Sequence, residues 1–368
     1  MRAAVLVLAV LLAPSLAAAL PAPTTAWVVA SDTTLESVPF VFAQDVLVMP
    51  GATLRLVDVD GVVARPLNIT VRGALEIVGG TRLAAAALAF DLYVAPGGAL
   101  VTQDATIVGA RLVLAGDSAL ALSSFTTSDL RVLAARTVAL GGSFAGSTGN
   151  LLTVEGGALD VEGASLEGAG AAAAFVGPAG ALRLANVTVG RTGDYGVRVE
   201  HGAATIENAT FALSPEYAVY ANDADVVIVD SSFSTHCGAY LVSGTRGRVE
   251  RSSFTTIDHG LSLVQAGALA VRANVFDGTQ EALLMYASAP EIRRNAFSGN
   301  ANGVHVLAGA ASAPTLRENA FEGNGVAVKN EASATLDATQ NWWGAASGPA
   351  AGDTSGAVTT SPWLVAAP

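Results

Sequence analysis

Short apolar phrases recur along the chain at a nearly constant spacing. Each begins with small or turn-forming residues and continues as an apolar–polar–apolar triplet, as in PGATLRL at 50–56 and GGALDV at 156–161. Alternation with a period of two predicts short β-strands. Aligning the last apolar residue of each phrase gives one column: Leu56, Ile77, Thr102, Leu122, Leu140, Val161, Leu184, Ile206, Ile228, Val249, Val271, Ile292, Leu316 and Leu336. Its thirteen intervals cover 280 residues, a mean of about 21.5 residues per repeat.

The second half of the chain adds further columns to this repeat. Phenylalanine lies five residues after the aligned position in six repeats: Phe211, Phe233, Phe254, Phe276, Phe297 and Phe321. A glycine followed by an alternating strand recurs at Gly196, Gly260, Gly303 and Gly325. We expect the phenylalanines to stack inside the fold. We also expect an asparagine ladder at a bend, formed by Asn274, Asn295 and Asn319.

Repeats of this length with two or three short strands and no helical stripe predict an all-β, parallel β-helix of about 13–14 coils. In such a solenoid the strands of successive coils stack at about 4.8 Å, so like residues lie on like residues. The leucine-rich repeat phrase is absent, and a β-propeller blade is about twice as long. The strands of an outer-membrane barrel alternate in direction, which three distinct columns per unit do not describe.

Two phrases carry a resemblance to a known group. NAFSGNANGVHV (295–306) and NAFEGNGVAV (319–328) resemble the repeats of the pectin-lyase-like superfamily, especially secreted proteins grouped with NosD and the carbohydrate-binding and sugar-hydrolase (CASH) domains. The ending, N-W-W-G at 341–344, G-P at 348–349 and P-W-L at 362–364, is similar to the closure of such domains. The resemblance covers 180–368 well and implies a single-stranded, right-handed β-helix. It does not select a function, because that superfamily includes lyases, hydrolases, binding modules and adhesins.

The ends of the chain are expected to differ from the repeats. A positive start, an apolar run over 5–13 and small residues at Ala17 and Ala19 predict a secretory signal peptide at 1–19. Segments 20–45 and 337–368 are expected to cap the open sheet edges of a β-helix at 46–336. No membrane span or anchor is predicted, because no other apolar run reaches the ~20 residues that a span needs. We therefore expect a secreted or cell-surface protein, and a monomer.

The composition and net charge of the chain limit the fold classes and the kinds of partner that are compatible with it. With 51% hydrophobic residues, mean hydropathy of +0.48 and 14% charged residues, the chain is not disordered, and a single cysteine excludes a disulfide scaffold. A formal net charge of −12 disfavours nucleic acid as a partner, because phosphate neutralisation needs a basic surface.

Ionisable and aromatic residues gather in two adjacent columns just before the small residue, glycine or alanine, that opens each of the alternating strands. One column reads Asp194, Glu216, His236, Asp258 and Gln280, and the next reads Tyr195, Tyr217, Cys237, His259, Glu281, Asn302 and Asn324. Carboxylates on neighbouring coils would lie near 5 Å apart, and those two coils apart near 10 Å, separations that glycoside hydrolysis uses. The candidate catalytic residues are Asp194, Glu216, His236, Asp258, His259 and Glu281.

Three other interpretations of these columns stay open. Tyr195 and Tyr217 could stack on sugar rings and bind substrate. His236, Cys237 and His259 could, with Asp258, ligate a transition metal, although we assign no metal site. Polar residues also collect near turns simply because turns are solvated.

A second outward surface carries an arginine stripe. Its columns read Glu207, Glu250, Arg272, Arg293 and Arg317, then Asp230, Arg251, Arg294 and Glu318. Arg272 and Arg293 are candidates for binding an acidic polysaccharide through bidentate contacts, and the alternative is an exposed network of ion pairs.

Most enzyme signatures of the superfamily are missing. There is no N-T-D or G-H-G, and Asp258-His259-Gly260 is only a partial match. We identify no cofactor; calcium remains unsupported because no aspartate cluster stands beside the arginine stripe. The sequence favours a carbohydrate-associated β-helix protein with a binding or surface role and a polysaccharide or cell-surface glycan as its partner. The alternatives are a polysaccharide lyase or glycoside hydrolase, and a structural or adhesive rod.

Overall fold

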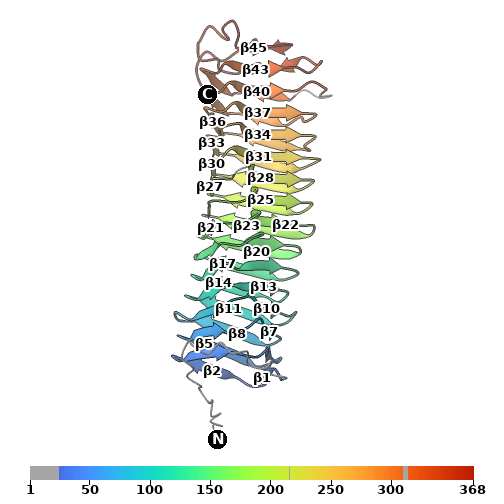
Figure 1. Ribbon diagram of the computed structural model, residues 1–368. Coiled ribbons are helices and arrows are strands. Elements are labelled where there is room, and N and C mark those ends of the chain that lie inside the picture. Colours follow the sequence, from blue (N-terminus) through green and yellow to red (C-terminus); the bar gives the residue numbers. More distant parts are fainter. Residues whose placement is uncertain (1–24, 215, 310–313) are drawn as a thin grey trace.

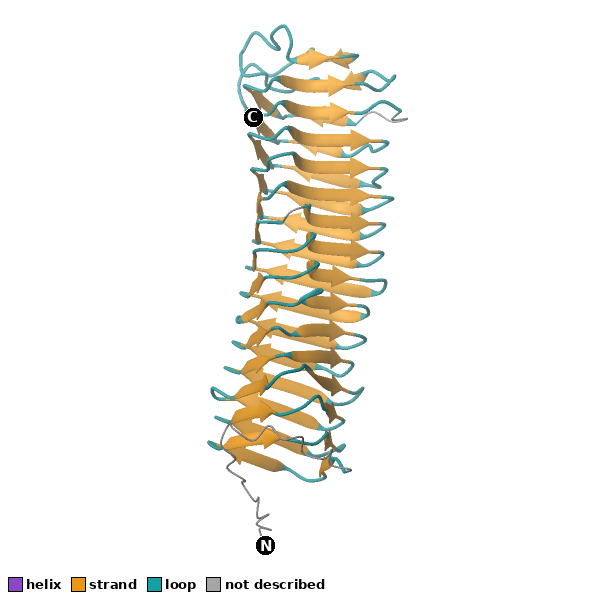
Figure 2. Ribbon diagram, in the orientation of Figure 1, coloured by secondary structure: helices purple, strands orange, loops and turns teal. Residues whose placement is uncertain are grey.

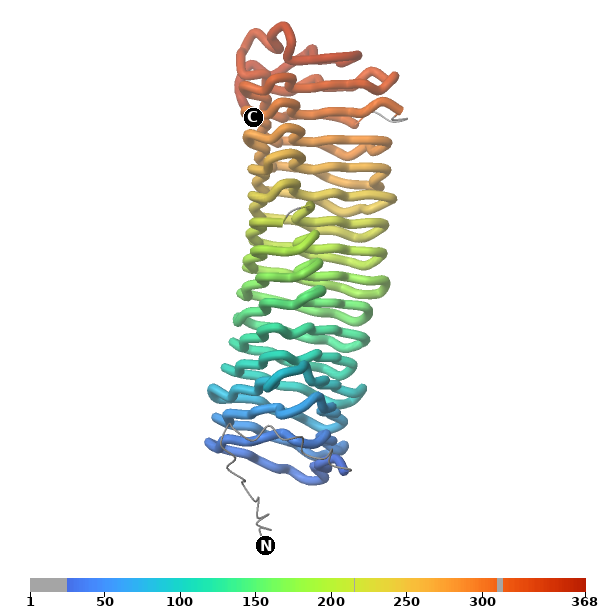
Figure 3. The backbone as a smooth tube through the Cα atoms, viewed as in Figure 1, coloured from blue at the N-terminus to red at the C-terminus, as the bar shows by residue number. Residues whose placement is uncertain are grey.

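The chain winds into a stack of coils whose strands form three long parallel sheets. A computed structural model describes residues 25–214, 216–309 and 314–368, and these residues contain no helix (Figures 1 and 2). Sequence order follows the stack from one end to the other (Figure 3). The predicted all-β parallel β-helix is confirmed.

Sheet A carries the first strand of each coil. Its sixteen strands, in spatial order, are β1 (Trp27–Val29), β4 (Val46–Val48), β7 (Asn68–Val71), β10 (Phe90–Val94), β13 (Ala110–Leu114), β16 (Asp129–Val132), β19 (Leu152–Val154), β22 (Ala172–Val176), β25 (Tyr195–Glu200), β28 (Tyr217–Asn222), β31 (Cys237–Val242), β34 (His259–Val264), β37 (Glu281–Tyr286), β40 (Asn302–Val306), β43 (Val326–Asn330) and β45 (Thr354–Ser355).

Sheet B carries the second strand and the aligned apolar column. Its sixteen strands are β2 (Thr33–Glu36), β5 (Thr53–Val57), β8 (Ala74–Val78), β11 (Ala99–Gln103), β14 (Ser118–Ala121), β17 (Arg136–Leu140), β20 (Gly157–Glu162), β23 (Gly180–Ala185), β26 (Ala203–Glu207), β29 (Asp225–Val229), β32 (Arg246–Glu250), β35 (Leu269–Arg272), β38 (Glu291–Arg293), β41 (Thr315–Arg317), β44 (Leu336–Asp337) and β46 (Val358–Thr359).

Sheet C closes each coil and carries the phenylalanine column. Its fourteen strands are β3 (Pro39–Phe42), β6 (Asp60–Val63), β9 (Arg82–Ala85), β12 (Thr106–Val108), β15 (Ser124–Thr126), β18 (Ser143–Ala145), β21 (Ser165–Glu167), β24 (Thr188–Val189), β27 (Thr210–Ala212), β30 (Ser232–Ser234), β33 (Ser253–Phe254), β36 (Val275–Asp277), β39 (Ala296–Ser298) and β42 (Ala320–Glu322).

The two end segments carry strands of the same sheets. Strands β1 to β3 lie within the segment expected as the N-terminal cap, and β45 and β46 lie within the C-terminal one. The stack is therefore slightly longer than the 13–14 coils that the repeat count predicts. The predicted signal peptide at 1–19 lies outside the described residues. Within the residues that are described, no helix is long and apolar enough to cross a membrane.

Strand register confirms most of the aligned apolar column and corrects three of its members, the first two of which are Leu122 and Leu140. Thr102 pairs with Leu120 and Leu120 with Ala139, so Leu122 and Leu140 were wrongly aligned. Both are exposed, at 62% and 48%, whereas Leu120 and Ala139 are buried. These two coils span only 18 and 19 residues, shorter than the mean repeat.

Two shifts near the C-terminal end also correct the alignment. Asn302 pairs with Val326, so Gly303 lies opposite Ala327 and not opposite Gly325. Thr315 pairs with Asp337, which moves Leu336 out of the column that Leu316 belongs to.

The phenylalanine column forms the predicted internal stack. Rings from Phe211 to Phe321 lie nearly parallel on their neighbours, with centroid distances between 4.6 and 5.0 Å. Trp343 continues the stack at 5.1 Å from Phe321. A glycine lies beside the stack because a Cβ at Gly238 would be 2.2 Å from the carbonyl oxygen of Gly260 and 2.7 Å from the Phe254 ring.

The predicted asparagine ladder is confirmed and is longer than expected. Asn274, Asn295 and Asn319 are buried, and each Nδ2 donates to the Oδ1 of the next asparagine at 3.0 Å, ending on Asn341. A second ladder at the other end of sheet C joins Asn300 Nδ2 to Asn324 Oδ1 at 2.9 Å. The two ladders fix the bends on both sides of sheet C, and hence the angle at which sheet A begins.

Candidate functional site

The candidate columns lie where sheet C turns into sheet A. In register, Tyr195 pairs with Tyr217, Tyr217 with Cys237, and His259 with Glu281. The other column precedes these residues by one position. Adjacent coils are joined there by backbone hydrogen bonds, such as Asp258 N to His236 O at 3.0 Å. One column therefore consists of the first residues of the sheet A strands β25, β28, β31, β34 and β37, and the other column lies one residue before them.

Tyrosines from three coils gather on the outer face of sheet A. The Tyr217 ring stacks on Tyr240 at 4.9 Å, Tyr220 lies 5.9 Å from Tyr240, and Tyr195 lies 5.5 Å from Tyr220. All four are half-buried. We call these four tyrosines, together with Phe175 and Arg198, the aromatic strip.

Arg198 lies among the rings at one end of the aromatic strip. Its guanidinium is 5.9, 5.5 and 5.8 Å from the ring centroids of Phe175, Tyr195 and Tyr220, within the range of cation–π attraction. Its Nε and Nη2 donate to Glu200 Oε1 at 3.0 and 2.8 Å. Arg198 is therefore held in place and its charge is balanced.

Burial raises the pKa of three tyrosines of the strip, Tyr195, Tyr217 and Tyr220. It raises the pKa of Tyr217 to about 12, with Cys237 and Tyr240 adding smaller contributions. Burial, followed by interaction with the Glu216 carboxylate, also raises the pKa of Tyr195. At neutral pH both phenols can donate and accept hydrogen bonds beside an apolar ring.

The predicted carboxylates Asp194 and Glu216 lie exposed beside this strip, and the backbone N–H of Glu216 donates to Asp194 O at 3.3 Å. A shallow hollow adjoins the same corner of the fold. It is lined by Arg191, Leu213, Ser214, Ser234, Thr235, His236, Thr255 and Ile257. Hydroxyl and apolar groups thus make up most of the hollow, and His236 is the candidate residue that it contains.

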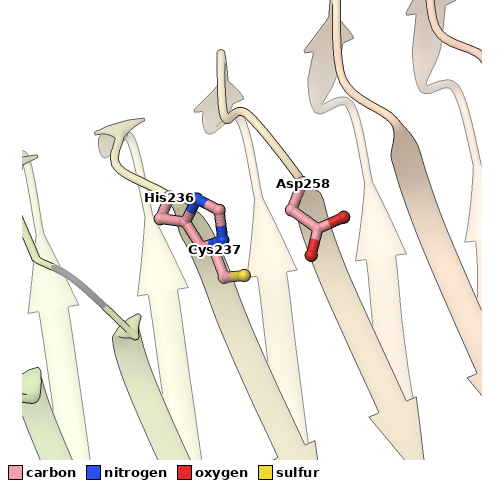
Figure 4. A group of neighbouring side chains, drawn as sticks. All are labelled: His236, Cys237 and Asp258. Atoms are coloured by element: carbon pink, nitrogen blue, oxygen red, sulfur yellow. The ribbon is translucent and has the colours of Figure 1, made fainter.

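His236, Cys237 and Asp258 converge from two neighbouring coils (Figure 4). One ligand atom from each lies within 4.8 Å of the others. His259 Nδ1 lies 3.0 Å from Asp258 Oδ2 and 3.7 Å from Cys237 Sγ. Burial raises the pKa of the Cys237 thiol, and the carboxylates of Asp258 and Glu216 raise it further. Chemically this cluster can bind a cation, and the thiol is protonated without one.

Glu281 belongs to a different cluster. Its Oε2 lies 3.1 Å from His305 Nδ1, and its Oε1 accepts a hydrogen bond from Asn302 at 2.8 Å. His305 Nε2 lies 3.2 Å from Glu331 without hydrogen-bond geometry, and Glu331 contacts Lys329 at 2.7 Å. Although Glu281 is in register with His259, its side chain contacts Asn302 and His305 on the next coil and points away from Asp258.

Arg272 and Arg293 lie at the ends of β35 and β38 in sheet B and do not join the other candidates. Arg272 pairs with Glu291, and Arg293 pairs with Glu318. Arg293 and Arg294 together lower the pKa of Glu318 to about 2. These carboxylates balance the arginines, which supports an exposed ion-pair network on this surface.

Sequence reasoning missed part of the aromatic strip. Arg198, Tyr220 and Tyr240 form one register column, which lies three residues after the column of Tyr195, Tyr217 and Cys237. The signal was available, because four of the chain's six tyrosines fall in these two columns. Seeing it required knowing that the second and third residues of β25 and β28 are both buried, so that the first and fourth residues lie together on the outer side.

Comparisons with known proteins agree with the fold. Residues 172–342 match the family described as right handed beta helix region. No curated protein sequence matches this chain.

Three solved structures are similar in chain path at low identity. The catalytic unit of a GH87 α-1,3-glucanase from Streptomyces thermodiastaticus is 11% identical, with a TM-score of 0.39 over 87% of this chain and 65% of its own length. PfbA, a surface adhesin of Streptococcus pneumoniae, is 9% identical, with a TM-score of 0.37 over 75% of this chain and 85% of PfbA. The A-module of the Azotobacter vinelandii mannuronan C-5 epimerase AlgE6 is 10% identical, with a TM-score of 0.37 over 85% of this chain and 91% of the module. This chain therefore spans about 65% of the glucanase unit, and similarity at this level carries no information about ligand or reaction.

Proposed function

We propose that this protein, whose residues 172–342 form a right-handed β-helix region, is an exported carbohydrate-binding protein that holds a neutral glycan on the aromatic strip. The observation that carries the proposal is the gathering of Tyr195, Tyr217, Tyr220 and Tyr240 on one outer face. An aromatic ring offers an apolar face to the C–H groups of a sugar, and the phenol hydroxyl at its edge reaches the sugar hydroxyls.

The charge around the strip favours a neutral glycan over an acidic one. Asp194, Glu216 and Glu200 border the tyrosines, and the arginine among them, Arg198, is already paired with Glu200. A uronic-acid polymer would meet repulsion from these carboxylates and from a chain of net charge −12.

The form of the strip suits an extended chain. Its tyrosines come from β25, β28 and β31, which are neighbours in sheet A and are spaced by about 4.8 Å. Because that spacing is close to the length of one sugar unit, successive rings of a polysaccharide could lie over successive coils. Half-buried rings packed on one another lose little side-chain entropy on binding, since their positions are already fixed.

The test is a panel of neutral and uronic-acid polysaccharides assayed for binding and for product release. We expect retention of one or more neutral glycans without cleavage, and loss of retention in Tyr217→Ala. Product release that disappears in Glu216→Ala or Asp258→Ala would instead establish the lyase or hydrolase alternative. Absence of any glycan interaction would leave the structural rod.

A further inference from the structure

The cluster of His236, Cys237 and Asp258 has the dimensions of a metal site. A tetrahedral zinc site places its ligand atoms about 3.3–3.7 Å apart, given bonds of about 2.0–2.3 Å. In this structure the three ligand atoms lie within 4.8 Å of one another, so small side-chain rotations would bring them onto one ion.

The backbone holds these side chains in place. Cys237 is the first residue of β31 and His236 directly precedes it, while Asp258 directly precedes β34, the next strand of sheet A. The hydrogen bond from Asp258 N to His236 O ties the two coils together at the ligands. Thr235 Oγ1 donates to the carbonyl oxygen of Cys237 at 2.6 Å, which further fixes the segment. The three side chains would therefore lose little conformational freedom when an ion binds.

The donor set selects the class of cation. A thiolate and an imidazole are poor ligands for calcium or magnesium, which prefer oxygen, and good ligands for zinc, cobalt or copper. The side chains span a range of exposure: Cys237 is 5% exposed, whereas His236 is exposed to solvent. An ion can thus enter from the His236 side and reach a sulfur that is otherwise covered.

We propose that His236, Cys237 and Asp258 bind a divalent transition-metal ion of the zinc class, with one coordination position left to solvent. His259 is a positioning residue, since its Nδ1 contacts Asp258 Oδ2 at 3.0 Å and can orient that carboxylate toward the ion. The site adjoins the aromatic strip through Tyr217, the register partner of Cys237, but does not depend on the proposed glycan binding.

The experiment uses the whole chain without an affinity tag, stripped with a chelator and titrated with Co²⁺ and then Zn²⁺. We expect one equivalent of Co²⁺ to bind with a thiolate-to-cobalt charge-transfer absorption, and Zn²⁺ to abolish that absorption by displacement. Metal content after dialysis gives an independent measure of stoichiometry.

Variants assign the ligands. Cys237→Ser should abolish the charge-transfer band, and His236→Ala, an exposed position that cannot disturb the core, should weaken binding at least tenfold. His259→Ala should keep the charge-transfer band, shift the ligand-field bands and weaken binding by about 10–100-fold. His201→Ala is the matched control, because His201 lies 3.2 Å from Asp223 in an exposed pair elsewhere and should leave binding unchanged.

Three outcomes would overturn the proposal. One is the absence of stoichiometric Co²⁺ or Zn²⁺ binding by the folded chain. Another is metal binding by Cys237→Ser and His236→Ala that is as strong as binding by the native chain. The last is metal binding that is lost only in His305→Ala. Either of these results would locate the ion elsewhere.

Discussion

The buried amide of Asn295 makes four hydrogen bonds to three neighbouring residues. Its Oδ1 accepts from the backbone N–H of Asn274 at 2.9 Å and from Asn274 Nδ2 at 3.0 Å. Its Nδ2 donates to Val271 O at 2.9 Å and to Asn319 Oδ1 at 3.0 Å. One side chain therefore satisfies polar groups that no water reaches, at the bend between sheets B and C.

Asn295→Ala should destabilise the protein by about 3 kcal/mol, because it leaves the N–H of Asn274 and the carbonyl of Val271 buried without partners. Chemical denaturation measures the difference. The control is Asn222→Ala, where a single hydrogen bond from Asn222 Nδ2 to Glu200 at 2.9 Å lies on the half-exposed outer face. A loss no larger than that of the control would contradict the structural role of the ladder.

At the scale of the coil, the sequence predicts which residue types recur in successive repeats better than it predicts which residues pair between neighbouring strands. The phenylalanine and asparagine columns were predictable, because one bulky or amide-bearing residue that recurs in several consecutive repeats admits one alignment. The errors at Leu122 and Leu140 arise where coils shorten to 18 and 19 residues and several apolar residues compete. Coil length is set by turns whose residues vary, so spacing alone cannot settle which leucine points inward.

The candidate site shows a similar limit. Tyr195, Tyr217, Cys237 and His259 could be placed in one column because each directly precedes a small residue, glycine or alanine, near the start of a strand. Which outward columns share a face depends on the bend between sheets C and A, so Tyr220 and Tyr240 were not included. The ion-pairing of Arg272 and Arg293 likewise depends on glutamates from neighbouring coils, Glu291 and Glu318.

Ion pairs between coils give a prediction about pH. Hydrogen bonds from Arg317 lower the pKa of Asp337 from its usual 3.8 to about 2. Because the folded state holds the carboxylate ionised, its contribution is present above the usual pKa of 3.8 and is lost as pH falls through the folded-state pKa of about 2. Asp337 is about half exposed, so solvent screening limits the contribution to about 1 kcal/mol or less.

Asp337→Asn should therefore be less stable than the native chain at pH 5, and the difference should shrink progressively as the pH falls through the folded-state pKa of about 2. Urea unfolding at successive pH values measures this. Asp277→Asn, at a carboxylate that accepts a hydrogen bond from Ser298, is the comparison. A difference that persists unchanged at pH 2 would mean that the ion pair with Arg317 is not its source.

For the whole molecule, the solenoid explains how an apolar chain remains compact in a single stack. Each coil adds inward residues to one continuous core, so burial grows with the number of coils and not with the number of domains. The exposed edges are then confined to the two ends. At the C-terminal end, Trp343 covers Phe321, and β45 and β46 pair with β43 and β44.

A chain shortened to end at Leu336 should self-associate, because it exposes the edges of β43 and the ring of Phe321. Sedimentation velocity measures this, with the full chain expected to remain a monomer. A chain ending at Leu364, which removes only exposed residues, serves as the control. Monomeric behaviour of the shorter chain would show that these edges need no cover.

Calorimetric titration of matched tyrosine variants tests most directly whether a neutral glycan binds on the aromatic strip. Tyr220 lies among three partners of the strip, whereas Tyr93 occupies the same outward column of sheet A several coils away and is 37% exposed. The glycan retained best by the native chain should bind about tenfold more weakly to Tyr220→Ala, the loss of about 1.4 kcal/mol expected for one stacked ring, and equally well to Tyr93→Ala. Equal affinity of all three proteins, or an equal loss in both variants, would mean that the glycan does not bind on the aromatic strip.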